Sequence, residues 1–481
     1  MLKVYNSYSD SIEEFVPIKE NEVTMYVCGP TVYDNPHLGH ARCYITWDMV
    51  YRYLKFLGYK VTYCRNVTDV DDKILAKAKA ENTTQEAIAK KYYDIFSQSM
   101  KKLNVLKPDI EPFATKHIGE MILIVKTLID KGFAYESEGD VYFRVNKFKK
   151  YGQLSKQPLE DLEAGARVET SDKKENVLDF ALWKKDEIDG YKSQWGLGRP
   201  GWHIECSAMS KKHLGEQIDI HAGGADLIFP HHENEIAQSE CANDKQFVRY
   251  WLHNGFVTIN KEKMSKSLKN FVTIDDLLAN YSSNTIRFFI LTNHYRMPVE
   301  FNDEALSSAQ AGFKRLNTAI NDVLSFLNTN IETISLFEEG VEHFKNAMNN
   351  DLNTSKALAI LFDIATKANK AKDERNTLDA AMYVKTLVYL SSVLGFVPEK
   401  KELSEEELDK RLKTILTDLT FLSATDRDLN GNALMGKIIE YRNKARLEKN
   451  WGIADKIRNT LDSINIVLKD SKDATIWEEK N

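Results

Sequence analysis

The spacing of apolar residues over the first 65 positions predicts a strand, a helix and a second strand. Residues 24–28 form a short apolar run that stops at Gly29. Apolar side chains then recur every four residues between positions 45 and 57, which predicts a helix over 38–57. A second apolar run occupies 61–65. Together they form a βαβ unit, which predicts a parallel sheet with ligands at the carboxyl ends of its strands.

The same patterning predicts that this sheet domain is interrupted. Residues 1–115 would form its first half and 201–302 its second half, with strands at 218–221 and 255–258. Between the halves, 116–200 mixes helical with strand-like patterns, as an insertion would.

Helical spacing of apolar residues continues after the second half and predicts a bundle over 303–396. Residues 397–411 are dense in charge, and Ser404 and Glu407 are spaced as a capping box for a following helix. We expect 397–481 to hold this linker and a small C-terminal module. The predicted fold class is α/β, with a Rossmann-type parallel sheet split by an insertion, then an α-helical bundle and the C-terminal module.

Composition adds limits to this picture. The chain is 43% hydrophobic and 28% charged, as a globular protein is, and its net charge of −6 gives no overall sign of nucleic-acid binding. The five cysteines include no CxxC pair, which favours reduced thiols over a disulfide framework. Because no leader-like or membrane-spanning apolar run is visible, we expect a cytoplasmic protein without membrane contact. We also expect a monomer.

The first candidate site is His37-Leu38-Gly39-His40, between the first strand and the helix. Unpaired N–H groups at a helix N-terminus attract phosphate, and Gly39 lets a ligand approach the backbone closely. Both histidines could donate to phosphate oxygens. Taken alone, a His-x-x-His stretch is weak evidence, because histidines are more often structural.

The second candidate site is the stretch from Lys263 to Ser267, which reads Lys-Met-Ser-Lys-Ser. Its two lysines and hydroxyls, with Asn270 nearby, suit a loop that closes on a polyphosphate. Taken alone, the stretch is better explained by an exposed polar loop.

Together the two stretches match the HIGH and KMSKS signatures of class I aminoacyl-tRNA synthetases in order and separation. Leu38 stands where the signature has isoleucine, which is a harmless apolar exchange. The sequence also resembles the cysteinyl-tRNA synthetase family in particular, at residues 26–33, 201–206, 229–235, 442–458 and 466–468. The resemblance implies an enzyme that activates L-cysteine with ATP and transfers it to the 3′-terminal ribose of tRNA(Cys).

The resemblance also implies roles for individual residues, in a reaction that needs positioning and charge stabilisation but no covalent nucleophile. The catalytic residues would be His37, His40, Lys263 and Lys266. ATP, with Mg²⁺, would contact His37, Gly39, His40, Asp226 and Lys266. The pocket for cysteine would include Gly29, Thr68, Trp202 and His221.

A zinc ion that binds the cysteine thiolate is implied as well, with Cys28, Cys206, His231 and Glu235 as its ligands. The local pattern agrees, because residues 231 and 235 would share one face of a helix. Two thiolates, an imidazole and a carboxylate are an accepted zinc set. Without the resemblance, buried structural thiols would be the preferred explanation for the two cysteines.

The C-terminal module would bind tRNA, through a local excess of basic residues and through flat tryptophan rings on which bases could stack. The implied contacts are Arg442, Arg446, Trp451, Asp455, Arg458 and Trp477. The alternative is a small helical cap whose tryptophans are core residues.

Two other functions stay open at this point. A ligase that joins cysteine to an amino sugar in thiol-cofactor synthesis would resemble the same catalytic core, but it would lack the tRNA-binding tail. An inactive homologue that only binds tRNA or nucleotide would carry broken HIGH or KMSKS residues, and both motifs are intact.

Overall fold

The computed structural model describes residues 1–158, 173–259, 262–263, 271–327, 331–399, 405–470 and 475–479. It divides into two compact units, Met1–Pro398 and Glu399–Asn481. In the described part of the chain, no helix combines the length and the apolarity that a membrane span needs.

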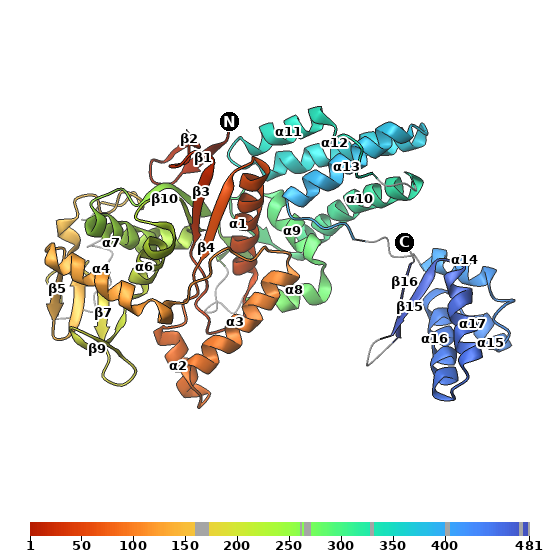
Figure 1. Cartoon of the computed structure of the whole chain (residues 1–481), viewed down its shortest axis with the longest axis horizontal. Coiled ribbons are helices and arrows are strands. Elements are labelled where there is room, and N and C mark those ends of the chain that lie inside the picture. The colour runs from red at the N-terminus through yellow and green to blue at the C-terminus, as the bar shows by residue number, and fades with distance from the viewer. Residues whose placement is uncertain are drawn as a thin grey trace. The chain divides into compact units, whose positions relative to one another are not determined.

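The centre of the first unit is a four-stranded sheet with the order β11-β10-β3-β4, in which every neighbouring pair is parallel. Its strands are β3 (Glu22–Val27), β4 (Lys60–Arg65), β10 (Ile218–Gly224) and β11 (Val248–Asn254). The predicted Rossmann-type parallel sheet is therefore confirmed, and Figure 1 shows α1 beside it.

The predicted strand at 255–258 is not part of this sheet. Residues Val257–Ile259 form β12, which pairs with β13 (Glu262–Lys263) and β14 (Val299–Phe301) in a separate three-stranded sheet. The fourth strand of the parallel sheet is β11, whose pattern includes the polar residues Arg249, His253 and Asn254. These polar positions hide the strand from a search for apolar runs.

Helix α1 (Leu38–Phe56) connects β3 to β4 and buries apolar side chains on most of its surface. Leu38, Ile45 and Met49 have no exposed surface, because the helix packs into a core shared by the sheet and the following helices. A helix buried on this scale has its start and its orientation fixed by packing.

The region between the half-sheets contains α4 (Ile118–Asp130) and a five-stranded antiparallel sheet with the order β5-β6-β7-β9-β8. Its strands are β5 (Ala134–Ser137), β6 (Asp140–Phe143), β7 (Phe180–Lys185), β8 (Tyr191–Ser193) and β9 (Gly196–Pro200). Further elements of the first unit are β1 (Lys3–Asn6), β2 (Ser11–Glu14), α2 (Asp72–Ala80), α3 (Gln85–Lys102), α6 (Trp202–Leu214), α7 (Glu233–Asn243), α8 (Ile274–Asn280) and α9 (Ser283–Thr292).

Four helices follow and lie together in Figure 1: α10 (Asp303–Leu327), α11 (Glu338–Met348), α12 (Thr354–Asp373) and α13 (Thr377–Val393). Their apolar faces belong to the same core as α1, which makes the bundle part of the first unit.

The second unit has a core of its own. It contains α14 (Glu405–Thr414), α15 (Ala424–Arg427), α16 (Gly431–Leu447), α17 (Trp451–Asp462) and the antiparallel pair β15 (Ile466–Asp470) and β16 (Thr475–Glu479). Of the predicted capping box, Glu407 lies in α14 and Ser404 lies outside the described residues.

A pair of imidazoles between α4 and α6 generates a pH prediction. His117 Nε2 lies 2.8 Å from His213 Nε2, so the two rings share one hydrogen. Burial lowers the pKa of His213, and His117 and Lys212 lower it further. Below the usual histidine pKa of about 6.5 the unfolded chain takes up a proton that the folded state resists, so stability should fall as the pH drops.

Replacing His213 by Gln should flatten this acid-side loss, measured as the free energy of unfolding in urea between about pH 7.5 and 5.5. The exposed His343→Gln is the matched control and should keep the wild-type slope. Equal slopes for wild type and His213→Gln would show that the pair does not contribute.

Candidate functional site

A pocket of about 250 Å³ lies at the carboxyl ends of the parallel strands. Three groups of residues line it. Cys28 and Gly29 follow β3, and His37, Gly39 and His40 lie at the start of α1. Gly224 and Asp226 lie at and just after the end of β10, and residues 254–257 lie at and just after the end of β11. The pocket therefore joins the predicted thiol site to the predicted phosphate site.

The two histidines of the first motif cap the helix that they begin. His37 Nδ1 accepts a hydrogen bond from the Gly39 N–H (3.1 Å), and His40 Nδ1 accepts one from the His37 N–H (3.2 Å). Their rings stack with centroids 3.9 Å apart. Because each Nδ1 is an acceptor, a neutral ring carries its hydrogen on Nε2, which can then donate.

The second motif lies largely outside the described residues. Lys263 ends β13, nothing is described of its side chain, and Lys266 and Ser267 fall in 264–270. The chain that follows returns to the first motif: the Leu38 N–H donates to Val272 O (3.0 Å) and the Ile274 N–H donates to Pro36 O (3.0 Å). The segment directly after the KMSKS stretch is thus bound to the HIGH loop.

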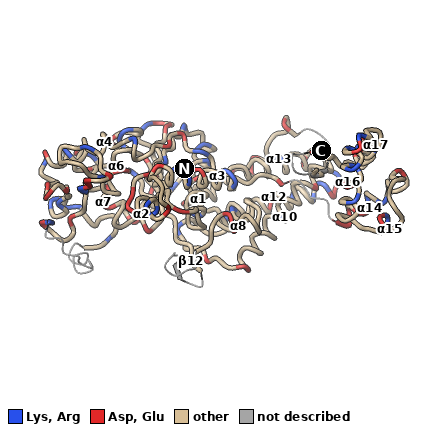
Figure 2. Tube along the Cα trace, turned by 90° about the horizontal axis from the view of Figure 1, so that it is seen from below, with Lys and Arg blue, Asp and Glu red and all other residues tan. Residues whose placement is uncertain are grey.

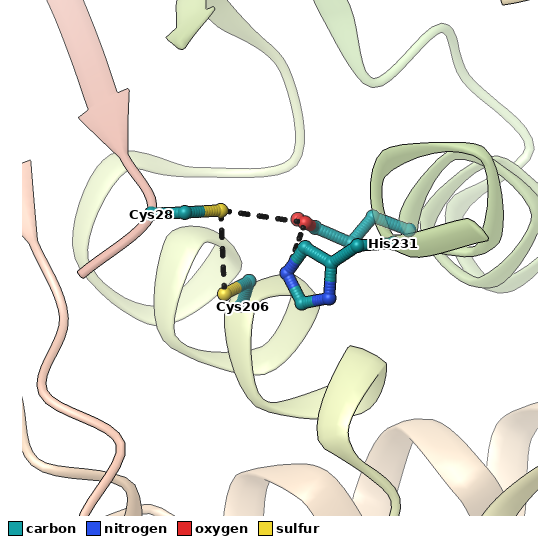
Figure 3. Close-up of side chains that lie close together, drawn as sticks. Cys28, Cys206 and His231 are labelled. Carbon is teal, nitrogen blue, oxygen red and sulfur yellow. Dashed lines mark hydrogen bonds and ion pairs between the residues drawn. The ribbon is translucent and has the colours of Figure 1, made fainter. Parts of the chain in front are cut away.

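The four predicted metal ligands converge. Figure 3 shows three of them, Cys28, Cys206 and His231. Cys28 follows β3, Cys206 lies on α6, His231 lies in the turn before α7, and Glu235 lies on α7. Each is exposed by 6% or less. Cys28 Sγ lies 3.8 Å from Cys206 Sγ and 3.7 Å from Glu235 Oε1, and His231 Nε2 lies 3.0 Å from that carboxylate oxygen.

The distance between the two sulfurs fits a shared metal ion. A tetrahedral zinc with Zn–S bonds of about 2.3 Å separates its two sulfurs by about 3.8 Å, the spacing of Cys28 and Cys206. The donor set also fits by its chemistry, because thiolates and imidazole are ligands that zinc prefers. The cluster could therefore hold a divalent transition metal.

The pKa shifts within the cluster also favour a bound cation. Burial raises the pKa of Cys28 well above its usual value, and Cys206 and Glu235 raise it further. The hydrogen bond with Cys28 lowers the pKa of Cys206 to about 6. Burial opposes ionisation of Glu235, yet His221 and His231 lower its pKa to about 2. Burial and its anionic neighbours thus hold the Cys28 thiol neutral, and a bound cation would let both thiols ionise.

A second donor set was missed by the sequence analysis. His221 and His232 join Cys28 and Glu235 as ligand atoms close enough to share an ion. His232 Nε2 lies 3.3 Å from Cys28 Sγ, and His221 Nε2 lies 2.8 Å from Glu235 Oε2. His221, predicted to line the cysteine pocket, therefore also contacts the carboxylate of a predicted metal ligand. The adjacent histidines 231 and 232 could have indicated this second donor set, since both precede Glu235 by about one helical turn.

The other predicted cysteine-pocket residues surround the cluster. Trp202 is 41% exposed and its ring lies over His231, with centroids 4.2 Å apart. Thr68 is buried and donates to Glu205 Oε2 (2.7 Å). The Gly29 N–H donates to Asn66 Oδ1 (2.7 Å).

Asn66 is another residue that the sequence analysis missed. Its Oδ1 lies 3.7 Å from Cys206 Sγ, and its Nδ2 donates to Thr68 Oγ1 (3.3 Å). It connects the thiol cluster to Gly29 and Thr68. Its place directly after β4, at the carboxyl end of a parallel strand, was the signal that could have found it.

In the second unit, some of the predicted tRNA contacts are buried or half-buried and others are exposed. Arg442 is 6% exposed and binds both carboxylate oxygens of Asp470, at 2.8 and 2.9 Å, so we withdraw it as a surface contact. Trp477 is half-buried against the core of this unit.

By contrast, Trp451 is 59% exposed. Arg446 binds Asp470 (2.7 Å), and Arg458 binds Asp455 (3.2 Å) with more than half of each side chain exposed.

Solved structures share this fold. Mycobacterium tuberculosis methionyl-tRNA synthetase, in complex with methionyl-adenylate, has a TM-score of 0.59, at 16% identity over 85% of this chain and 97% of that one. The ternary complex of Agrobacterium radiobacter K84 LeuRS, tRNA and LeuAMS also has a TM-score of 0.59, at 10% identity over 79% and 85%. The fold and the paired motifs are those of a class I aminoacyl-tRNA synthetase.

Family models and curated relatives identify the family within this class. A model described as tRNA synthetases class I (C) catalytic domain matches residues 14–311, and one described as DALR domain matches 343–398. The cysteine–tRNA ligase of Fusobacterium nucleatum is 44% identical over 99% of this chain and 100% of its own length. That of Actinobacillus pleuropneumoniae serotype 5b is 46% identical over all of both chains. The chain belongs to the cysteine–tRNA ligase family.

Proposed function

We propose that the protein activates L-cysteine with ATP to cysteinyl-AMP and then transfers cysteine to the 3′-terminal ribose of tRNA(Cys). One observation carries the proposal: Cys28, a member of the buried Cys–Cys–His–Glu cluster, lines the same pocket as the HIGH histidines. The family membership and the match along the whole chain support it.

The proposed chemistry needs no covalent enzyme intermediate, since the cysteine carboxylate attacks the α-phosphorus of ATP and pyrophosphate leaves. His37 and His40 would donate from Nε2 to the phosphates, because their Nδ1 atoms cap the helix. Asp226 and Gly39 line the pocket where the rest of ATP, with its Mg²⁺, would lie. Lys263 and Lys266 would neutralise the leaving phosphates.

Selection of cysteine would depend on zinc held by Cys28, Cys206, His231 and Glu235. Zinc, when bound, favours an ionised thiol over a neutral hydroxyl as its ligand, which would exclude serine. Gly29, Thr68 and Trp202 lie around the cluster and would hold the rest of the amino acid.

The thiol-cofactor ligase is the weaker alternative. The second unit, 399–481, forms a compact module with its own core, which supports an enzyme with a separate tRNA-binding module. The relatives quoted above match this chain from end to end, including that module.

The decisive experiment is ATP–pyrophosphate exchange with each of the twenty amino acids, followed by charging of total tRNA. We expect exchange with cysteine, little with serine, and charging of tRNA(Cys) alone. Cysteine-dependent exchange without tRNA charging would favour the ligase, and no exchange at all would refute both enzymes.

The zinc site is tested by Cys206→Ser. Elemental analysis should find about one zinc per wild-type chain, and the variant should lose the metal and bind cysteine more weakly, while ATP binding is spared. Cys241→Ser is the matched control, because Cys241 is also buried but lies outside the donor cluster. A metal-free enzyme that still prefers cysteine to serine would contradict the proposed selection.

For the tRNA contact, the turn between α16 and α17 is the best-supported surface. It exposes Leu447 (85%), Trp451 (59%) and Ile453 (38%). Both helices carry basic residues, whose positions along the chain are blue in Figure 2. Exposed aromatic and apolar side chains within a basic surface suit unstacked bases and their phosphates.

We therefore expect Trp451→Ala to weaken tRNA binding by about 1–3 kcal/mol, the cost of losing one stacked base. Trp451→Phe should restore most of the affinity, since it keeps a flat ring. Cysteine-dependent pyrophosphate exchange should stay unchanged in both. Binding titrations at several salt concentrations check this, and equal affinity of Trp451→Ala and wild type would remove the turn from the contact surface.

A further inference from the structure

Three arginines of the first unit have side chains that are almost wholly buried: Arg42 (1% exposed), Arg65 (3%) and Arg287 (1%). Two of them have a carboxylate partner. Arg65 binds Glu111 at 2.6 Å, and Arg287 binds Asp48 at 2.8 Å. Among the described residues, Arg42 has no carboxylate at ion-pair distance. A buried cation without a counter-charge is costly, so its other contacts must explain its place.

Those contacts are four backbone carbonyls. Arg42 Nη1 donates to Ile290 O (2.8 Å), and Nη2 lies within hydrogen-bond distance of the carbonyls at 294, 295 and 297, at 3.0, 2.8 and 3.1 Å. They belong to the end of α9 and the chain that leaves it. The planar guanidinium presents several fixed donors, so it can gather carbonyls that would otherwise repel one another.

The gathered segment supports one wall of the pocket. Tyr295 O, which accepts from Arg42, also accepts from the Gly255 N–H (2.8 Å). The Val299 N–H donates to Phe256 O (2.9 Å), and Val299 pairs with Val257 in the parallel pair of β12 and β14. Residues 255–257 line the pocket, and β12 leads to Lys263.

The other wall begins on the helix that carries Arg42. His37, Gly39 and His40 line the pocket from the start of α1, and Arg42 is two residues further on. We propose that Arg42 is a positioning residue for ATP: it fixes the wall at 255–257 against the HIGH wall, and so sets the spacing in which the nucleotide is aligned. This inference rests on the proposed ATP-dependent function of the same pocket.

The contact between Gly255 and this segment is too close for a side chain. A Cβ at position 255 would lie 2.5 Å from Met297 O and 2.7 Å from Arg296 O. The wall and the carbonyl segment are therefore in direct backbone contact, and a shift of the segment would move the wall with it.

The test is pyrophosphate exchange by full-length Arg42→Lys, with ATP and cysteine varied in turn. Lysine keeps the charge but loses the planar fork, so kcat/KM for ATP should fall by about 10²-fold, the cost of a misplacement near 1 Å. The KM for cysteine and the metal content should not change. Arg287→Lys is the matched control: it loses an equally buried arginine on α9 that does not line the pocket, and should keep wild-type ATP kinetics.

Wild-type ATP kinetics in Arg42→Lys would overturn the proposal. If Arg42→Lys matches wild type and Arg42→Met is impaired, the charge matters and the positioning does not, which also overturns it.

If Arg42→Lys does not fold, Gly255→Ala decides, because it separates wall and segment while leaving the guanidinium in place. That variant should show the same selective loss for ATP, and unchanged ATP kinetics would refute the inference. Absence of exchange in the wild type would instead refute the proposed function.

Discussion

The parallel pairing of β3 with β4 on one side and β10 on the other is the constraint on which the site depends. Because all three strands end at the same edge, the residues that follow them must meet there. Cys28 and Asn66 follow β3 and β4, and Asp226 follows β10. A thiol and a carboxylate that are nearly 200 residues apart thus line one pocket. An antiparallel arrangement of any one strand would move its residues to the opposite edge.

The thiol cluster adds an electrostatic constraint to this topology. Two thiols, an imidazole and a carboxylate lie within 4 Å of a neighbour, with almost no solvent contact. Around them a hydrogen-bonded chain continues from His232 to His253 and Ser7, each link 2.8 Å long. Burial lowers the pKa of His253 to about 3, so this chain supplies neutral, orienting partners. The negative charge is concentrated on the donor atoms, which is where a cation would be held.

Much of this could be predicted from the sequence. The helix over 38–57 and the buried run at 24–28 have strong periodicity and agree closely with α1 and β3. The strand β11 could not be predicted, because its burial comes from packing within the sheet and under the N-terminal strands, which a sequence pattern with His253 and Asn254 does not reveal. The set of four metal ligands was predicted from the family resemblance, since no spacing rule connects Cys28 with Cys206.

The misses share a physical cause. Arg442 was placed on the surface because it lies in a basic stretch, but its partner Asp470 lies on a strand 28 residues later. Arg42 was not singled out at all, because its partners are backbone carbonyls, which every sequence contains. A local charge pattern gives the position of a basic residue along the chain, but the tertiary fold determines which groups its side chain contacts. The two arginines differ for that reason: Arg442 has a carboxylate partner, whereas Arg42 has none among the described residues and donates to backbone carbonyls that support a wall of the pocket.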